Sequence, residues 1–157
     1  MARHVHRVRL DASVEAVGAL LDALGSEHDR VWPADRWPPM RLEGPPAPGV
    51  RGSHGPVRYT TEAFEPGRRL CFRFTAPAGF VGSHQFLVIP EGEGVWFVHE
   101  LEITPRGLAR LLWPLVFGPL HDALARDAIA RVVRASGGEA EPAPWSAWVR
   151  LLRLAAR

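Results

Sequence analysis

Hydrophobic and polar positions alternate at the start of the chain and then change to a helical period. In HVHRVRL, residues 4–10, every second residue beginning with His4 falls on one face, which predicts a β-strand. Residues 13–24 follow, with apolar residues at helical spacing and a serine placed to cap the first turn. Gly25 ends this predicted helix at the position where left-handed backbone is needed.

Short alternating runs separated by turn residues fill the middle of the chain. Residues 40–55 are rich in glycine and proline, which predicts a loop with a short edge strand. Four strands are then predicted, over residues 57–65, 68–76, 79–89 and 95–104. A long helix follows from Arg106 onward. This order of strand, helix, several strands and a long helix predicts an α+β domain with an antiparallel sheet.

The last two predicted strands flank PEGEG, residues 90–94, and form a hairpin. Pairing Pro90 with Val95 sets the register of the whole hairpin. It places seven residues on one face: His84, Phe86, Val88, Phe97, His99, Leu101 and Ile103. The opposite face carries a more polar set: Gln85, Trp96, Glu100 and Glu102. A shift of one residue would reverse both faces.

The most hydrophobic part of the long C-terminal segment contains residues that interrupt helices. Pro114, Gly118 and Pro119 lie within RLLWPLVFGPLHDALARDAIARVV, residues 110–133, although an interior proline costs roughly 3 kcal/mol. Two interpretations are open. Either the helix bends over a cavity and frees backbone carbonyls, or a separate short turn precedes a helix that starts at Pro119.

Farther along this segment, two aspartates are each followed by an arginine four residues later. In a helix, Asp122 would pair with Arg126 and Asp127 with Arg131. Such pairs stabilise a helix by roughly a few tenths of a kcal/mol each. We expect both pairs to face the solvent and to have no functional role.

The composition fits one globular domain and excludes several kinds of chemistry. The chain has 157 residues, of which 46% are hydrophobic and 23% charged. All of its basic residues are arginine, which excludes a lysine Schiff base and the lysine of a phosphate-binding loop. The net charge of +2 is spread along the chain, so we expect no nucleic-acid partner. Cys71 is the single cysteine, which excludes an internal disulfide and a cysteine zinc cluster.

Hydropathy bears on location. The chain has no run of 18 or more apolar residues, so no transmembrane helix is predicted. Its basic start lacks the apolar segment of a signal peptide. We therefore expect a cytoplasmic location.

The ordered set of motifs resembles the SRPBCC superfamily, the START, Bet v 1 and polyketide cyclase-like helix-grip proteins. The resemblance covers residues 3–136 and rests on VHRVRLDASVEAVGALL, YTTEAFEPGRRLCFRF, GSHQFLVIPEGEGVWFVHELEI and WPLVFGPLHDALARDAIARVV. It implies a curved antiparallel sheet wrapped around a long C-terminal helix, with an internal cavity for apolar or amphipathic small molecules. It implies no particular chemistry, since the superfamily includes carriers, cyclases and dehydratases.

The leading functional prediction is binding of a small hydrophobic or aromatic ligand, lipid- or polyketide-like, in that cavity. The candidate ligand-binding residues are Tyr59, Phe72, Phe74, His84, Phe86, Phe97, His99, Trp113, Phe117 and His121. In the rival prediction, a polyketide cyclase or dehydratase-type enzyme, His84 and His99 are the catalytic residues. They are diagonal neighbours in the predicted hairpin, and imidazoles that titrate near neutral pH can move a proton. The alternative is that one or both are hydrogen-bonded core histidines.

The histidines are also possible metal ligands. His121 is expected to point into the same space as His84 and His99, and three histidines can ligate a metal. Their spacing matches no zinc signature on a helix, and the pair His4 and His6 lies on a terminal strand. We therefore expect no metal site and no cofactor.

The C-terminal part of the chain is predicted to lie outside the domain. Residues 1–136 form the predicted domain, residues 137–144 a polar linker, and residues 145–157 a short amphipathic helix. Trp145 and Trp148 fall on one face of this helix, opposite three arginines, Arg150, Arg153 and Arg157. Such a helix can lie on an anionic membrane, dock to a partner, or fold back onto its own domain. A membrane-associated interaction module is therefore a third functional prediction, and the sequence leaves the oligomeric state open.

Overall fold

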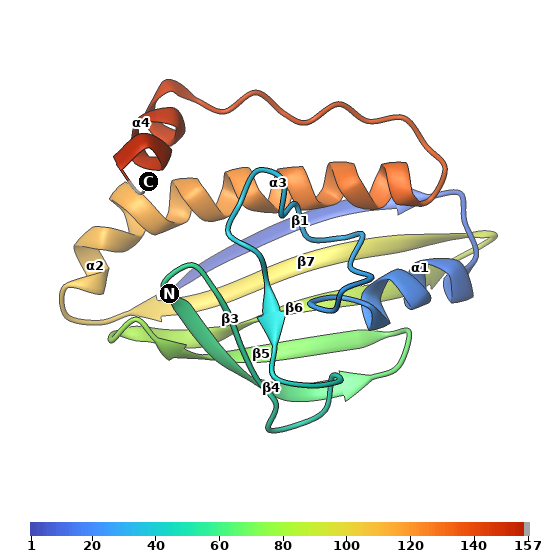
Figure 1. Cartoon of the computed structure of the whole chain (residues 1–157), viewed down its shortest axis with the longest axis horizontal. Coiled ribbons are helices and arrows are strands. Elements are labelled where there is room, and N and C mark those ends of the chain that lie inside the picture. The colour runs from blue at the N-terminus through green and yellow to red at the C-terminus, as the bar shows by residue number, and fades with distance from the viewer. Residues whose placement is uncertain (156–157) are drawn as a thin grey trace.

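The computed structural model describes residues 1–155 and shows a curved sheet crossed by one long helix (Figure 1). The strands are β1 (Ala2–Leu10), β2 (Arg41–Leu42), β3 (Arg51–His54), β4 (Val57–Glu65), β5 (Arg69–Ala76), β6 (Phe80–Glu91) and β7 (Gly94–Pro105). The helices are α1 (Val14–Asp22), α2 (Ala109–Leu112), α3 (Gly118–Ala135) and α4 (Ala147–Ala155), with a π-helical turn, η1 (Trp113–Phe117). The sheet is antiparallel, in the order β1-β7-β6-β5-β4-β3-β2. This confirms the predicted α+β helix-grip fold.

The predicted register of the β6–β7 hairpin is confirmed. Pro90 pairs with Val95, and Phe86 pairs with His99. The seven residues predicted for one face are all buried, whereas the four residues named for the opposite face are partly or fully exposed. The alternation in the sequence therefore placed His84 on the inner face of the sheet correctly.

The edge strand β1 completes this inner face. It pairs with β7, so that His6 lies opposite His99 and His4 opposite Leu101. Alternate residues of β1 are half-buried and exposed, as the sequence pattern predicts. α3 contacts β1, and α1 lies against β6 and β7.

The proline-containing segment is helical throughout but changes its winding. The N–H of Gly118 donates to the carbonyl of Trp113, five residues earlier, which defines the π-helical turn η1. Pro114 and Pro119 both lie in a first turn, of η1 and of α3 respectively. The structure thus combines the two interpretations. The segment before α3 is a distinct π-helical turn, and the chain nevertheless stays helical from this turn into α3.

The two aspartates of α3 do not form the predicted solvent-facing pairs with arginine. Asp127 is only 2% exposed and instead binds Trp37 and Trp145. Arg131 pairs with Asp35, at 2.7 Å. Asp122 accepts hydrogen bonds from histidines of β1. The predicted pairing was therefore wrong, since each aspartate binds partners distant in sequence.

The C-terminal segment returns along α3. Residues 139–146 have no regular secondary structure and run back beside the long helix to α4 (Figure 1). The last part of the predicted terminal helix, residues 156 and 157, lies outside the described residues. Within residues 1–155, no helix has both the length and the apolar content required to cross a membrane.

Candidate functional site

Six of the seven histidines gather between the sheet and α3, and we call them the histidine cluster. They are His4, His6, His54, His84, His99 and His121. The ring centroids of His84 and His99 are 5.9 Å apart, and those of His99 and His121 are 5.0 Å apart. The prediction that His84 and His99 are neighbours on the inner face is therefore confirmed. β1 and the β3–β4 hairpin add histidines that the prediction did not include.

The two candidate catalytic histidines lie among aromatic rings. The His84 ring stacks against Phe72, with a centroid distance of 5.0 Å, and against Phe74, at 5.1 Å. The His99 ring lies 4.6 Å from the Phe86 ring. His84 and His99 are each 4% exposed. In the described part of the chain, Nε2 of His84 and Nδ1 of His99 have no hydrogen-bond partner.

Burial decides the charge of these imidazoles. It lowers the pKa of His84 well below the ordinary value, and the neighbouring His54 and His121 lower it further. The pKa of His99 is lowered in the same way, by burial first and then by neighbouring histidines. Burial also lowers the pKa of His54 to about 3. Each of these rings is therefore neutral at pH 7, with one nitrogen able to accept a proton or hydrogen bond.

Tyr59 adds a phenol to the cluster. Its hydroxyl lies 3.3 Å from Nδ1 of His54, and its ring lies 5.1 Å from the ring of His84. Burial raises the pKa of Tyr59, so the phenol stays protonated. The ring fits because residue 52 is glycine: a Cβ there would lie 2.4 Å from a Tyr59 ring carbon.

An apolar pocket of about 440 Å³ opens beside the histidine cluster, and we call it the side pocket. The β3–β4 hairpin, the η1–α3 helix and α4 form its walls. The lining residues are Trp37, Pro38, His54, Gly55, Pro56, Val57, Val116, Phe117, Leu120, His121, Leu124, Leu152, Arg153 and Ala155. This volume lies in the range of known small-molecule sites.

Only part of the predicted ligand-binding set lines the side pocket. Phe117 and His121 do so. The others lie deeper and contact one another across the sheet: Tyr59, Phe72, Phe74, His84, Phe86, Phe97 and His99. Trp113 lies in a separate buried cluster with Phe80. Much of the space predicted to be hollow is therefore occupied by the side chains that were predicted to line it.

Asp127 fixes the C-terminal segment, and with it α4, beside the pocket. Its carboxylate accepts a hydrogen bond from Nε1 of Trp37 at 2.7 Å and from Nε1 of Trp145 at 3.0 Å. Arg36 pairs with the other carboxylate oxygen at 2.6 Å. The Arg36 guanidinium also lies 4.3 Å from the centroid of the Trp145 ring. In the structure the terminal helix therefore lies against its own domain, and Nε1 of Trp148 donates to the carbonyl of Leu115.

A curved sheet, a long C-terminal helix with an irregular first turn and a pocket beside it define a helix-grip protein. The chain matches no known sequence family and no curated protein sequence. Solved structures are similar to it in fold at low sequence identity, and three of them are informative.

A protein from Thermobifida fusca has a TM-score of 0.65 at 19% identity, over 91% of this chain and 100% of that one. CalU16 from Micromonospora echinospora has a TM-score of 0.60 at 17% identity, over 98% of this chain and 83% of that one. Norcoclaurine synthase from Thalictrum was solved with a transition-state analogue. It has a TM-score of 0.61 at 15% identity, over 87% of this chain and 96% of that one. The chain therefore shares the helix-grip fold of these proteins.

Proposed function

We propose that the chain binds a small apolar or amphipathic molecule in the side pocket. The observation that carries this proposal is the pocket itself, about 440 Å³ of space walled mainly by aliphatic and aromatic side chains. Similar folds that bind or transform organic molecules support it. The ligand class is lipid-like or polyketide-like, because the few polar groups on the walls suit one or two polar atoms on a largely apolar body.

The polar groups of the wall indicate how such a ligand is oriented. His54 and His121 are the imidazoles that line the side pocket, and Arg153 approaches from α4. A buried neutral imidazole hydrogen-bonds a carbonyl or hydroxyl, whereas a guanidinium binds a carboxylate or phosphate. We therefore expect an acidic or oxygenated head group at this end and a hydrocarbon or aromatic body against Leu120 and Leu124.

The test uses a pocket-filling variant and an apolar fluorophore. Phenylnaphthylamine should bind the full chain saturably, and Leu120→Trp should weaken that binding by at least about tenfold, because an indole occupies the pocket. Ile89→Trp, on an exposed position of β6, is the matched control and should bind normally. If both variants bind the fluorophore equally well, its binding site lies outside the side pocket. Native mass spectrometry of the purified protein would then identify any molecule that co-purifies.

An enzyme of the cyclase or dehydratase type is the second candidate function. It is favoured by the unpartnered buried nitrogens of His84 and His99, which remain free to exchange a proton. General acid–base catalysis requires these nitrogens within about 3 Å of the substrate, so a ligand would have to displace the rings around them. His84→Phe with His99→Phe should leave fluorophore binding intact in a carrier, and should abolish turnover in an enzyme.

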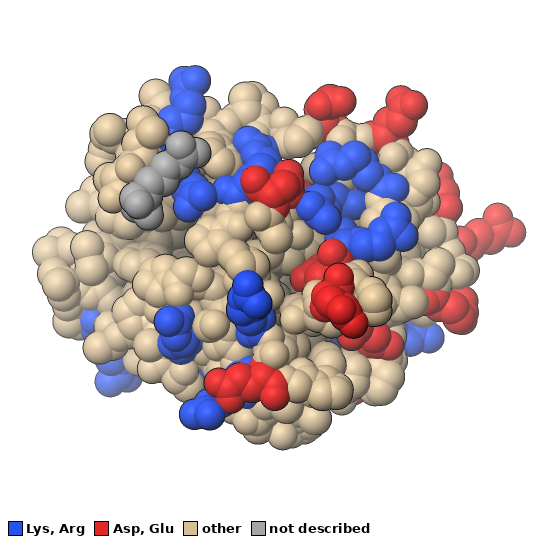
Figure 2. All heavy atoms as spheres, in the orientation of Figure 1, with Lys and Arg blue, Asp and Glu red and all other residues tan. Residues whose placement is uncertain are grey.

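Membrane contact is a third candidate function, and the surface around α2 and α4 favours it. Seven large apolar side chains are exposed there: Leu108, Leu111, Leu112, Leu115, Trp148, Leu151 and Leu154. Nε1 of Trp148 donates to the carbonyl of Leu115 at 2.7 Å, which joins α4 to η1. In Figure 2 the end of the molecule that carries α4 shows arginines among uncharged residues, and most acidic residues lie elsewhere on the same face. Apolar side chains beside arginines suit an anionic bilayer.

Sedimentation with vesicles tests this contact. The chain should pellet with vesicles that contain phosphatidylglycerol and remain in the supernatant with phosphatidylcholine alone. Trp148→Ala should reduce pelleting several-fold, whereas Ile89→Ala, an equally exposed apolar residue on β6, should not change it. Removal of residues 140–157 should abolish it. Pelleting that is the same in every variant would contradict the proposal.

A further inference from the structure

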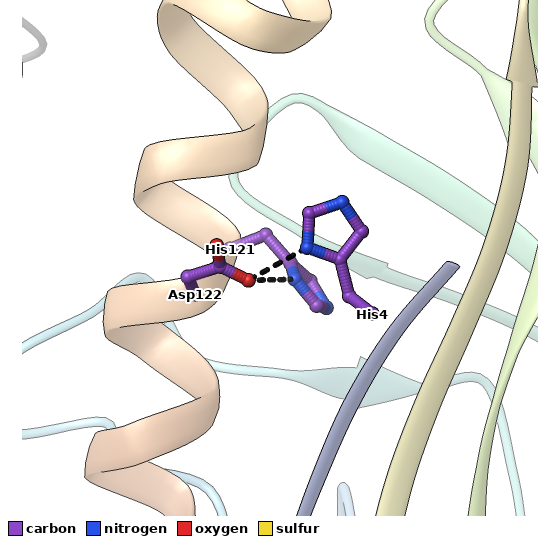
Figure 3. Close-up of side chains that lie close together, drawn as sticks. All are labelled: His4, His121 and Asp122. Carbon is purple, nitrogen blue, oxygen red and sulfur yellow. Dashed lines mark hydrogen bonds and ion pairs between the residues drawn. The ribbon is translucent and has the colours of Figure 1, made fainter. Parts of the chain in front are cut away.

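Figure 3 shows three side chains of metal-ligand type that come together from β1 and α3: His4, His121 and Asp122. His4 and His6 point to the same side because they lie two residues apart on one strand. Nδ1 of His4 lies 2.9 Å from Oδ1 of Asp122, and Nε2 of His6 lies 3.1 Å from the same oxygen. Nδ1 of His121 lies 3.5 Å from it. One carboxylate oxygen is thus surrounded by three imidazole nitrogens.

These separations match the spacing of ligands around a small divalent ion. Zn²⁺ binds nitrogen and oxygen at about 2.0–2.2 Å in a tetrahedron, which leaves its ligand atoms roughly 3.3 Å apart. Ligand atoms of His4, His121 and Asp122 all lie within 4.8 Å of one another. Small rotations of these side chains therefore suffice to bring them around one ion.

His121 supplies a second indication, because one nitrogen of its imidazole lacks a partner. Both ring nitrogens are buried; Nδ1 lies 3.5 Å from Oδ1 of Asp122, whereas Nε2 has no hydrogen-bond partner among residues 1–155. Leaving a buried polar group unpaired costs about 1–3 kcal/mol, so such groups usually have a partner or ligand.

From this geometry we infer a binding site for a divalent transition metal ion, with His4, His121 and Asp122 as ligands. Two imidazoles and one carboxylate favour Zn²⁺ over Mg²⁺ or Ca²⁺, which bind through oxygen. His6 holds the carboxylate of Asp122 by a hydrogen bond, as outer-shell residues do in zinc sites. The proposal departs from the sequence expectation that the chain has no metal site.

The site adjoins the side pocket through one residue. His121 belongs to the metal-ligand set and also lines the pocket wall. A metal ion held by His121 would fix the orientation of this imidazole, one of the polar groups available to a ligand. The inference itself does not depend on the proposed ligand-binding function, because it rests on the ligand atoms alone.

The experiment is a titration of the full chain, prepared without a polyhistidine tag and stripped with a chelator, with Zn²⁺ alone. Calorimetry should show one ion per chain with a dissociation constant in the micromolar range or tighter. Zn²⁺ should also raise the unfolding temperature, since it binds the folded state. His4→Ala and Asp122→Asn should each weaken binding by at least about tenfold.

The controls separate a metal site from a merely structural cluster. His28→Ala removes an exposed histidine outside the cluster and should leave Zn²⁺ affinity unchanged. Asp122→Asn keeps the shape of the side chain, so a folded variant that loses Zn²⁺ affinity supports a ligand role. The absence of saturable binding by the unmodified chain would overturn the inference. Undiminished affinity in both His4→Ala and Asp122→Asn would overturn it as well.

Discussion

The buried histidines predict that the protein loses stability under mildly acidic conditions. His84 and His99 are neutral in the folded state, because burial lowers the pKa of each well below its ordinary value. In the unfolded chain both titrate near pH 6.5. Below that pH the unfolded state binds protons that the folded state does not, so the free energy of unfolding falls as pH falls. The stability from neutral imidazoles is fully present above pH 6.5 and is lost below it.

The magnitude follows from this linkage. Between pH 7.5 and 5.5, one imidazole with an unfolded pKa near 6.5 and a much lower folded pKa costs about 1.4 kcal/mol. His84 and His99 together therefore cost about 2.7 kcal/mol, a large share of the roughly 5–15 kcal/mol that stabilises a domain. His54 and His121, whose pKa values are also lowered, act in the same direction. The carboxyl of Asp122 does not interfere, because its ordinary titration range lies below this window.

Urea unfolding at pH 7.5 and pH 5.5, with a chelator present, measures this loss. The double variant His84→Phe with His99→Phe keeps two aromatic rings among aromatic neighbours, and its loss between the two pH values should be smaller by about 2.7 kcal/mol. His28→Ala, whose side chain is 82% exposed, should lose as much stability as the unmodified chain. An equal loss in the double variant and the unmodified chain would refute the reasoning, as it would mean that these rings take up protons in the folded state.

Two further predictions concern packing. Asp127→Ala removes the acceptor of Trp37 and Trp145 and leaves the Arg36 cation without its anion. It should lower the free energy of unfolding, measured in urea, by about 3–5 kcal/mol, and it should speed proteolysis between residues 137 and 146. Unchanged cleavage would show that other contacts hold α4 in place. Gly52→Ala places a Cβ 2.4 Å from the Tyr59 ring, and should cost about 1–3 kcal/mol by urea unfolding. A loss below the error of that measurement would mean that Tyr59 moves freely.

The register of the hairpin was predictable because it depends on local pattern. Side chains alternate with a period of two, and the short loop between the strands leaves one pairing that buries the apolar set. Pro90 and Val95 lie close in sequence, so no distant contact was needed to place His84 and His99 on the same face. The same alternation correctly put His4 and His6 on one side of β1, without showing which element would lie against that side.

Roles that depend on distant partners were not predictable. The i,i+4 rule assigned Asp127 to Arg131 because it considers only neighbours on one helix. The actual partners, Trp37 and Trp145, come from a loop before β2 and from the segment before α4. A buried carboxylate between two indoles has no signature in local spacing. For the same reason the histidines were grouped as His84, His99 and His121, whereas β1 brings its own pair to α3.

The position of the side pocket follows from what fills the centre of the fold. Aromatic side chains from β4, β5 and β6 stack on one another and on His84, so they occupy the space between the sheet and α3. The side pocket lies beside the π-helical turn η1, between α4 and the β3–β4 hairpin. Because α4 forms one of its walls and Asp127 holds the segment that leads to α4, access to the pocket is coupled to a single buried carboxylate. The C-terminal segment is therefore part of the wall of the side pocket, and a chain truncated at residue 136 would lack the wall that α4 supplies.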